Sequence, residues 1–183
     1  MMAPTARLFF AIWPDAAARA RLYAHAQALH KDCGGRPMRR DNLHLTLVFL
    51  GTVPRTQIAH IEAVAARCGG PRFELALDTT GYWRHNRIVW AAPAVVPAPL
   101  RGLVVSLESG LAASGCTFDR RPYAPHLTLI RNAREPRPLP AFELAWPVAE
   151  FTLVESTRYE RGARYDAIAR WPLGGGAAVS AAR

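Results

Sequence analysis

The amino-acid sequence predicts an α+β protein made of two similar halves that face each other across a central cleft. Two observations carry this prediction. The tetrapeptide His-Leu-Thr-Leu begins at His44 and occurs a second time from His126. Each copy also lies at the end of a segment with the same predicted order of strand, helix and strand. The first strand and the motif histidine are 36 positions apart in the first segment, from Leu8 to His44, and 38 apart in the second, from Ile88 to His126. This internal similarity indicates two copies of one structural unit.

The first half contains three predicted strands and two predicted helices. Short apolar runs bounded by Pro or Gly predict the strands, and apolar residues at helical spacing, such as Leu22, Ala26 and Leu29, predict the helices. Pro14-Asp15 opens the first helix and Gly34-Gly35 ends it. In order, the elements are a strand over 7–13, a helix from 15 to about 33, a strand over 42–50, a helix after residue 54 that ends near 68, and a strand from 73 to about 82.

The second half repeats this order and adds further strands. Its helix has apolar residues in register at positions 100, 103, 104, 107 and 111, and three prolines and three arginines make 131–140 a loop. The predicted elements are a strand over 88–92, a helix from 99 to about 114, a strand over 125–130, strand segments at 142–144 and 150–155, and a final strand over 165–171. We expect residues 1–173 to form a single bilobal domain and residues 174–183 a flexible tail.

Each copy of the motif presents an imidazole beside a hydroxyl. Successive side chains of a strand point to opposite faces, so His44 and Thr46 share one face with Val48 and Leu50, while Phe49 lies with the leucines. The leucines are expected to pack beneath helices, which leaves histidine and threonine for the cleft. Two such pairs would supply a general base, a general acid and two hydrogen-bond donors.

The two motif histidines predict acid–base chemistry at a phosphodiester. An imidazole with a pKa of about 6.5 serves as neutral base or charged acid at neutral pH, so a pair does both without a cofactor. The reaction that fits best is an in-line displacement in which the threonine hydroxyls bind the nonbridging oxygens. A lone histidine on a strand is more often structural. That interpretation applies to the remaining histidines, His25, His30, His60 and His85.

The charge of the chain leaves two interpretations open. The formal net charge is +9, and Lys31 is the only lysine among 23 basic residues. Arginine suits phosphate and RNA recognition, but an arginine-, alanine- and proline-rich chain is equally consistent with a compositional bias. No Gly-x-x-x-x-Gly-Lys loop is present, which disfavours a lysine-adenylate mechanism. Three widely spaced cysteines and the lack of an acidic cluster predict neither a disulfide framework nor a metal site.

The sequence contains no candidate membrane segment. No apolar run approaches the roughly 20 residues that span a bilayer. The apolar stretch 8–13 is too short for the core of a signal peptide. We therefore expect a cytoplasmic protein.

The motifs and their flanks resemble those of the 2H phosphoesterases, and within them the LigT-like RNA 2',3'-cyclic phosphodiesterases, also called 2',5' RNA ligases. The likeness covers nearly the whole chain. One His-x-Thr-x match is a weak signal, whereas two with these flanks and this spacing are specific. Residues 7–12 resemble the family's first strand, 42–51 and 121–131 its two motifs, and 153–156, 162, 165 and 171–173 its closing strand pair.

The resemblance implies two pseudo-symmetric lobes, each an antiparallel sheet with helices on its outer face. It implies hydrolysis of RNA 2',3'-cyclic phosphate ends to 2'-phosphates, without metal or other cofactor, and a reversible ATP-independent 2',5' ligation. By analogy, His126 is the base that activates water and His44 the acid that protonates the leaving 3'-oxygen. The expected partner is RNA, such as tRNA fragments with cyclic phosphate ends, and the expected state is a monomer.

The same resemblance nominates substrate-binding residues. Thr46 and Thr128 would bind the phosphate, and Arg131 matches the family's arginine after the second motif. Tyr123 or Phe49 could stack a base, because an aromatic face accepts any base, although such residues are more often part of the core. Simple alternation puts Arg131 opposite the motif histidine, so it reaches the cleft only if the strand ends or bulges there. Five further arginines could line a groove for the RNA backbone: Arg36, Arg39, Arg40, Arg120 and Arg134. Most charged side chains are simply solvated at the surface, so that interpretation also applies to these five.

Two other functions stay open. One is a noncatalytic RNA- or nucleotide-binding module, and the other is a different 2H enzyme that acts on ADP-ribose cyclic phosphate or 2',5'-oligoadenylate. Intact His and Thr in both motifs favour an enzyme, because binding alone does not need two titrating groups.

Overall fold

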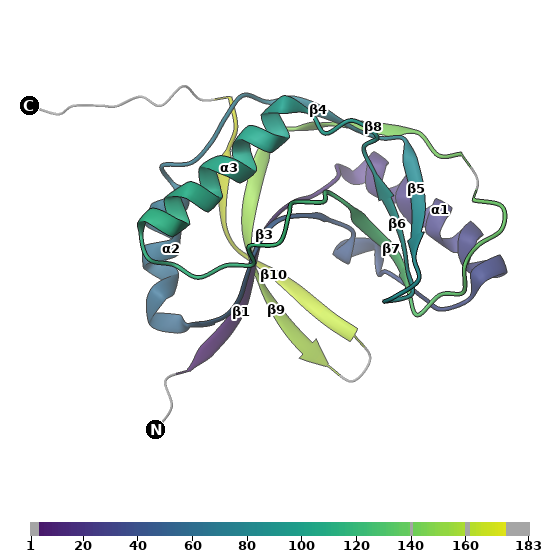
Figure 1. Cartoon of the computed structure of the whole chain (residues 1–183), viewed down its shortest axis with the longest axis horizontal. Helices are drawn as coiled ribbons and strands as arrows, with labels where there is room; N and C mark the ends of the chain where they lie inside the picture. Colours follow the sequence, from purple (N-terminus) through teal and green to yellow (C-terminus); the bar gives the residue numbers. More distant parts are fainter. Residues whose placement is uncertain (1–3, 140, 160–161, 175–183) are drawn as a thin grey trace, which may run out of the picture.

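The computed structural model describes residues 4–139, 141–159 and 162–174 (Figure 1). Its described residues form one eight-stranded sheet with the order β10-β9-β1-β3-β7-β6-β5, in which β2 pairs with β7, and a two-stranded sheet, β4-β8. The large sheet contains β1 (Thr5–Ile12), β2 (Arg36–Pro37), β3 (Leu45–Pro54), β5 (Thr79–Trp83), β6 (Ile88–Ala92), β7 (Leu127–Arg131), β9 (Glu150–Tyr159) and β10 (Gly162–Pro172); the small one contains β4 (Phe73–Leu77) and β8 (Leu144–Val148).

Three α-helices cover the sheet. Both ends of the first and the start of the third follow the predicted signals, whereas the second ends at residue 65, before the predicted end near 68. The helices are α1 (Ala16–Cys33), α2 (Ile58–Ala65) and α3 (Ala98–Ala113). The Asp15 carboxylate caps α1 by accepting a hydrogen bond of 2.8 Å from the Ala18 amide, and Gly34, with φ of 61°, ends it. Pro99 lies in the first turn of α3, where its missing N–H costs nothing.

The large sheet divides into two lobes at the motif strands, as the repeat predicts. β3 and β7 pair through one register position, Leu45 with Leu127. β1 flanks β3 on one side and β6 flanks β7 on the other, and all pairings are antiparallel. One lobe carries α2 and α3, and the other carries α1 (Figure 1). The predicted α+β fold of two antiparallel lobes with helices on their outer faces is confirmed.

The long helices cross between the lobes. α1 follows β1 in the chain but packs against β7, β2 and β8, whereas α3 follows β6 but packs against β3 and α2. The apolar stripes that these helices bury belong to one continuous core, which includes Leu22 from α1 and Leu107 from α3. Each half of the chain therefore covers the sheet of the other.

Several element boundaries differ from the predictions. The single strand predicted over 73–82 is two strands in different sheets, broken at Asp78, whose Oδ1 accepts a hydrogen bond of 2.6 Å from the Ala94 amide. The short strand β2 was not predicted, and β9 extends four residues beyond the predicted end. Of the predicted tail, residues 175–183 lie outside the described residues. No helix of the described residues combines the length and apolarity needed to cross a membrane.

Candidate active site

A β-bulge in the second motif strand turns Arg131 into the cleft. β7 pairs with β6 through Thr128 and Ile130, and Leu129 between them has no partner in the ladder. An extra residue of this kind restarts the alternation of side chains. Leu129 and Ile130 are consequently both buried, and Arg131 lies on the same face as Thr128. The sequence analysis predicts that Arg131 reaches the cleft only if the strand ends or bulges there, and this bulge meets that condition.

The first motif strand has a bulge at the matching position. β3 pairs with β1 through Thr46 and Val48, and Leu47 is skipped. Phe49 therefore returns to the cleft face with Thr46. The prediction that Phe49 lies with the leucines is wrong, as is the prediction that Val48 and Leu50 share the face of His44, because both are buried in the core. Phe49 and Arg131, each three residues after its threonine, thus occupy equivalent positions in the two lobes.

The cleft contains two adjoining cavities, with volumes of about 650 and 540 Å³. His44 lines the larger cavity and His126 the smaller one. The smaller cavity is also lined by Thr128 and Tyr123. Four residues line both: Arg7, Thr46, Phe49 and Arg131. The structure therefore brings all six predicted site residues to one cleft.

His44 sits against aromatic rings just before β3. Its ring centroid lies 4.9 Å from that of Phe9, 5.2 Å from Trp13 and 5.0 Å from Tyr165, which meets it edge-on. The pKa of His44 is lowered to about 4, mainly by burial among these rings and in smaller part by the charges of Arg131 and His126, while its hydrogen bond to the Asn42 carbonyl opposes the shift. His44 is therefore neutral at pH 7 in the unliganded protein.

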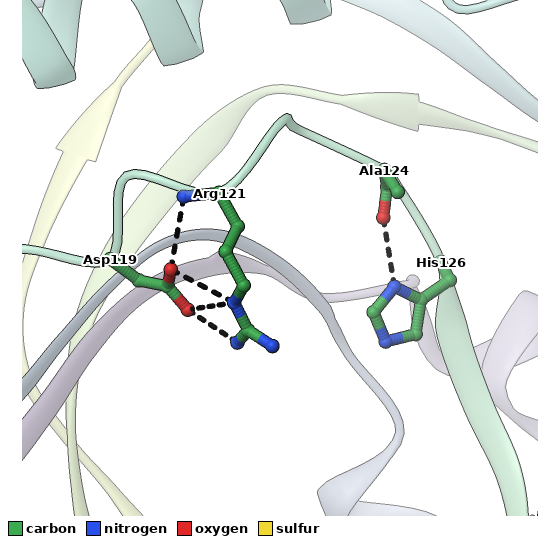
Figure 2. A network of polar contacts seen from close by, with 4 residues as sticks. All are labelled: Asp119, Arg121, Ala124 and His126. Atoms are coloured by element: carbon green, nitrogen blue, oxygen red, sulfur yellow. Dashed lines mark hydrogen bonds and ion pairs between the residues drawn. The ribbon is translucent and has the colours of Figure 1, made fainter. Parts of the chain in front are cut away.

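His126 has a similar but more open environment at the start of β7. Its ring meets the Trp83 ring edge-on at a centroid distance of 4.5 Å. Burial, and then Arg131, lower the pKa of His126, while its bond to the Ala124 carbonyl opposes the shift. Figure 2 shows this bond on the loop that enters β7, beside the ion pair of Asp119 and Arg121.

The same backbone contact fixes the tautomer of both histidines. Nδ1 of His44 lies 2.7 Å from the Asn42 carbonyl oxygen, and Nδ1 of His126 lies 2.8 Å from that of Ala124. A carbonyl oxygen only accepts hydrogen bonds, so Nδ1 carries the hydrogen and Nε2 carries the lone pair. Each lobe thus offers one Nε2 atom that can accept a proton and, once charged, return it.

Tyr123 links its loop to the first motif strand. Its hydroxyl donates to the Thr46 carbonyl oxygen at 3.4 Å, and burial raises the pKa of Tyr123. The hydroxyl is therefore protonated at neutral pH, and it joins the loop before His126 to the strand that carries Thr46.

The positions of the arginines correct part of the predicted groove. Arg36 and Arg39 line the larger cavity, but the described linings of the two cavities do not include Arg40, Arg120 or Arg134. Further lining residues were missed: Arg7, Phe9, Arg158, Tyr165 and Trp83. Strand alternation would have found the first two, because they lie two apart on β1. Arg158 and Trp83 lie beyond the predicted ends of their strands, β9 and β5. Tyr165 lies at the start of the predicted final strand, and no local pattern marked it as a cleft residue.

The titratable side chains of the site do not form a metal-ligand cluster. Over the described ranges, no group of three or more His, Cys, Asp or Glu side chains is arranged to hold a metal ion. The three cysteines are unpaired thiols, two of them buried. The two motif imidazoles are the predicted acid–base groups of the cleft. His85, which the sequence predicts to be structural, also lines the smaller cavity.

Comparison with known proteins places the fold and both motifs in one family. Residues 12–90 match the family model described as LigT like Phosphoesterase. The chain is 40% identical to the RNA 2',3'-cyclic phosphodiesterase of Escherichia coli (strain K12) over 175 residues, which cover 94% of this chain and 99% of the relative. It is 33% identical to the protein of the same name from Thermus thermophilus, over 92% of this chain and 91% of the relative.

Solved structures agree with this relationship. The crystal structure of E. coli LigT complexed with 3'-AMP matches with a TM-score of 0.84 and 39% identity, covering 94% of this chain and all of the other. The MHV ns2 PDE domain, at 15% identity and a TM-score of 0.60, shares the fold. The bilobal sheet, the doubled His-Leu-Thr-Leu motif and this similarity over nearly the full length lead to one conclusion: the chain belongs to the LigT-like phosphoesterases, a family of the 2H phosphoesterases.

Proposed function

We propose that this protein hydrolyses RNA 2',3'-cyclic phosphate ends to 2'-phosphates. The observation that carries the proposal is a cleft with two histidines, each held by a backbone carbonyl so that Nε2 is available, and each followed by its own threonine. The names of the E. coli and T. thermophilus relatives support the same reaction. The Arg131 guanidinium between the two cavities suits an anionic substrate.

The reaction needs one proton taken and one proton given. Neutral His126 accepts a proton from water as the water oxygen bonds to phosphorus. The bond from phosphorus to the 3'-oxygen breaks, and charged His44 protonates that oxygen, which leaves a 2'-phosphate and a 3'-hydroxyl. Thr46, Thr128 and Arg131 donate hydrogen bonds to the nonbridging oxygens, where negative charge accumulates.

Because the pKa of His44 is low in the free protein, the bound substrate itself must promote the protonation of His44. Burial and Arg131 keep His44 neutral in the free protein. A bound phosphodiester brings negative charge that offsets Arg131 and stabilises the imidazolium, so its pKa rises when substrate binds. The same groups serve a second reaction, in which the 5'-hydroxyl of a second RNA replaces water as the nucleophile. The bond from phosphorus to the 3'-oxygen again breaks, His44 protonates that oxygen, and a 2',5' linkage forms without ATP. We include this ligation, a monomeric state and a cytoplasmic location in the proposal.

The test is turnover of a 2',3'-cyclic mononucleotide in the presence of a chelator. We expect a 2'-phosphate as the product, and loss of activity in chelator would refute a metal-independent reaction. His44→Ala and His126→Ala should each lower kcat/KM by about 10² to 10⁴, as removal of an acid or base does. His60→Ala, at an exposed histidine outside the cleft, is the matched control. Near-normal rates in either motif variant would contradict the assignment.

A substrate panel separates this activity from its alternatives. ADP-ribose cyclic phosphate and 2',5'-oligoadenylate should be turned over more slowly than cyclic RNA ends. A substrate that binds but is never converted would identify a noncatalytic binding module instead.

A further inference from the structure

The larger cavity carries positive charge that its described lining does not balance. No aspartate or glutamate occurs among the described residues that line it. The smaller cavity differs, because its own arginine, Arg121, is paired with Asp119, and Glu108 lines it as well. The arginines of the larger cavity are Arg7, Arg36, Arg39, Arg131 and Arg158.

These five arginines stand apart from those that form ion pairs. In the described part of the chain, seven ion pairs join arginine to carboxylate, and none of them involves one of these five arginines of the larger cavity. Two of the five repel each other: burial and then the charge of Arg158 lower the pKa of Arg7. Like charges gathered in a cleft attract anions, and a bound anion relieves their repulsion.

The backbone holds Arg36 and Arg39 at the rim of the cavity. In the pairing of β2 with β7, Arg36 lies directly opposite Arg131, which puts their side chains on the same face, about 5 Å apart at Cβ. Gly35 permits this approach, because a Cβ there would lie 2.6 Å from the Arg131 carbonyl oxygen. The Met38 amide donates to the Leu129 carbonyl oxygen at 2.8 Å and holds the segment that leads to Arg39.

We propose that Arg36 and Arg39 bind backbone phosphates of the RNA upstream of the terminal cyclic phosphate, so that the protein prefers oligonucleotides to mononucleotides. This inference rests on the proposed function. In hydrolysis the second reactant is water, which needs no cationic site. The upstream RNA is the one polyanion in the reaction, and the larger cavity with its five arginines is the part of the cleft whose charge suits it.

This arrangement also assigns the two sides of the cleft. The leaving 3'-oxygen belongs to the terminal ribose, which is covalently joined to the upstream RNA. The ribose therefore lies on the side of the arginine cavity, which His44 lines. In an in-line displacement the nucleophile approaches from the opposite side, where His126 lines the smaller cavity. The charge distribution thus supports His44 as the acid and His126 as the base.

The experiment compares substrate lengths in variants of the full chain. The substrates are a 2',3'-cyclic mononucleotide and oligoribonucleotides of two to five residues that end in the same cyclic nucleotide. The variants are R36Q, R39Q and the double variant, with R40Q as the matched control, because Arg40 is an exposed neighbour outside the described cavity linings. Release of 2'-phosphate gives kcat/KM for each pair of protein and substrate.

The wild type should have a higher kcat/KM on the oligonucleotides than on the mononucleotide. In the double variant, kcat/KM on the oligonucleotides should fall at least about tenfold, whereas kcat/KM on the mononucleotide should change by less than about twofold. The slope of log kcat/KM against log salt on oligonucleotides should fall by about 1.4, since each lost contact to a single strand removes about 0.7. R40Q should match the wild type on both substrates.

Each other outcome overturns the inference in a distinct way. Equal losses on both substrates would assign Arg36 and Arg39 to the reacting phosphate. A loss confined to ligation of a 5'-hydroxyl acceptor would mean that the cavity holds the second RNA, and unchanged rates would mean that it holds none. A wild type that turns over neither substrate would refute the proposed function itself, and this inference with it.

Discussion

The low pKa of His44 predicts a specific loss of stability in mild acid. In the unfolded chain this histidine has a pKa of about 6.5, whereas burial lowers the pKa to about 4 in the folded protein. The unfolded state therefore binds a proton first as the pH falls. The free energy of unfolding should drop between about pH 6.5 and pH 4, and this contribution is fully present above that range.

The two pKa values set the size of the effect. One pKa unit corresponds to about 1.4 kcal/mol, so the loss between pH 8 and pH 4.5 amounts to about 2.5 kcal/mol from His44 alone. Carboxylates and other histidines also titrate in this range, so the wild type is compared with His44→Gln, which cannot take up the proton. The variant should lose about 2.5 kcal/mol less than the wild type over the same pH change.

Urea unfolding followed by circular dichroism at pH 8, 6 and 4.5 measures both proteins. The control is His60→Gln, at an exposed position, which should retain the pH dependence of the wild type. Parallel stability curves for wild type and His44→Gln would refute the reasoning, because they would mean that His44 titrates alike in the folded and unfolded chain.

Two further predictions follow from contacts in the cleft. Thr128→Val should lower kcat/KM on cyclic phosphates by about 10², the usual effect of losing one donor to a developing negative charge, with an unchanged unfolding midpoint; an unaffected rate would exclude the hydroxyl from phosphate binding. Gly35→Ala should cost at least about 1 kcal/mol in urea unfolding, because φ is +80° and the new Cβ would lie 2.6 Å from the Arg131 carbonyl oxygen. A variant as stable as the wild type would show that β2 can move away freely.

Local patterns in the sequence predict much of this fold because they agree with the final packing. The first helix has an Asp cap, a Gly stop and a stripe through Leu22 and Leu29, and all three persist in the structure. The doubled motif predicts two related lobes for the same reason. The motif recurs because each copy lies in a strand with the same kind of neighbour: β3 pairs antiparallel with β1, and β7 pairs antiparallel with β6.

The sequence predicts less where pairing between distant strands decides the geometry. The bulges at Leu47 and Leu129 depend on register with β1 and β6, and no local pattern marks them. They reversed the expected direction of Phe49 and brought Arg131 into the cleft. The split of the predicted 73–82 strand at Asp78 likewise depends on a contact with Ala94, 16 residues away. Residues that line a cleft from strand ends are missed when the extent of the strand is missed, as with Arg158.

The crossing of the two long helices has a consequence for how such a molecule can be assembled. A half-chain with β1, α1 and β3 would expose the sheet surface that α3 covers, and its own α1 would lack the strands on which it packs. Such a half could bury its apolar surface only by intertwining with a second copy. Two identical copies would carry the same residue at matching positions on either side of a symmetry axis. Joining both halves in one chain is what permits a phenyl ring at residue 49 and a guanidinium at residue 131, and so a cleft with two chemically different sides.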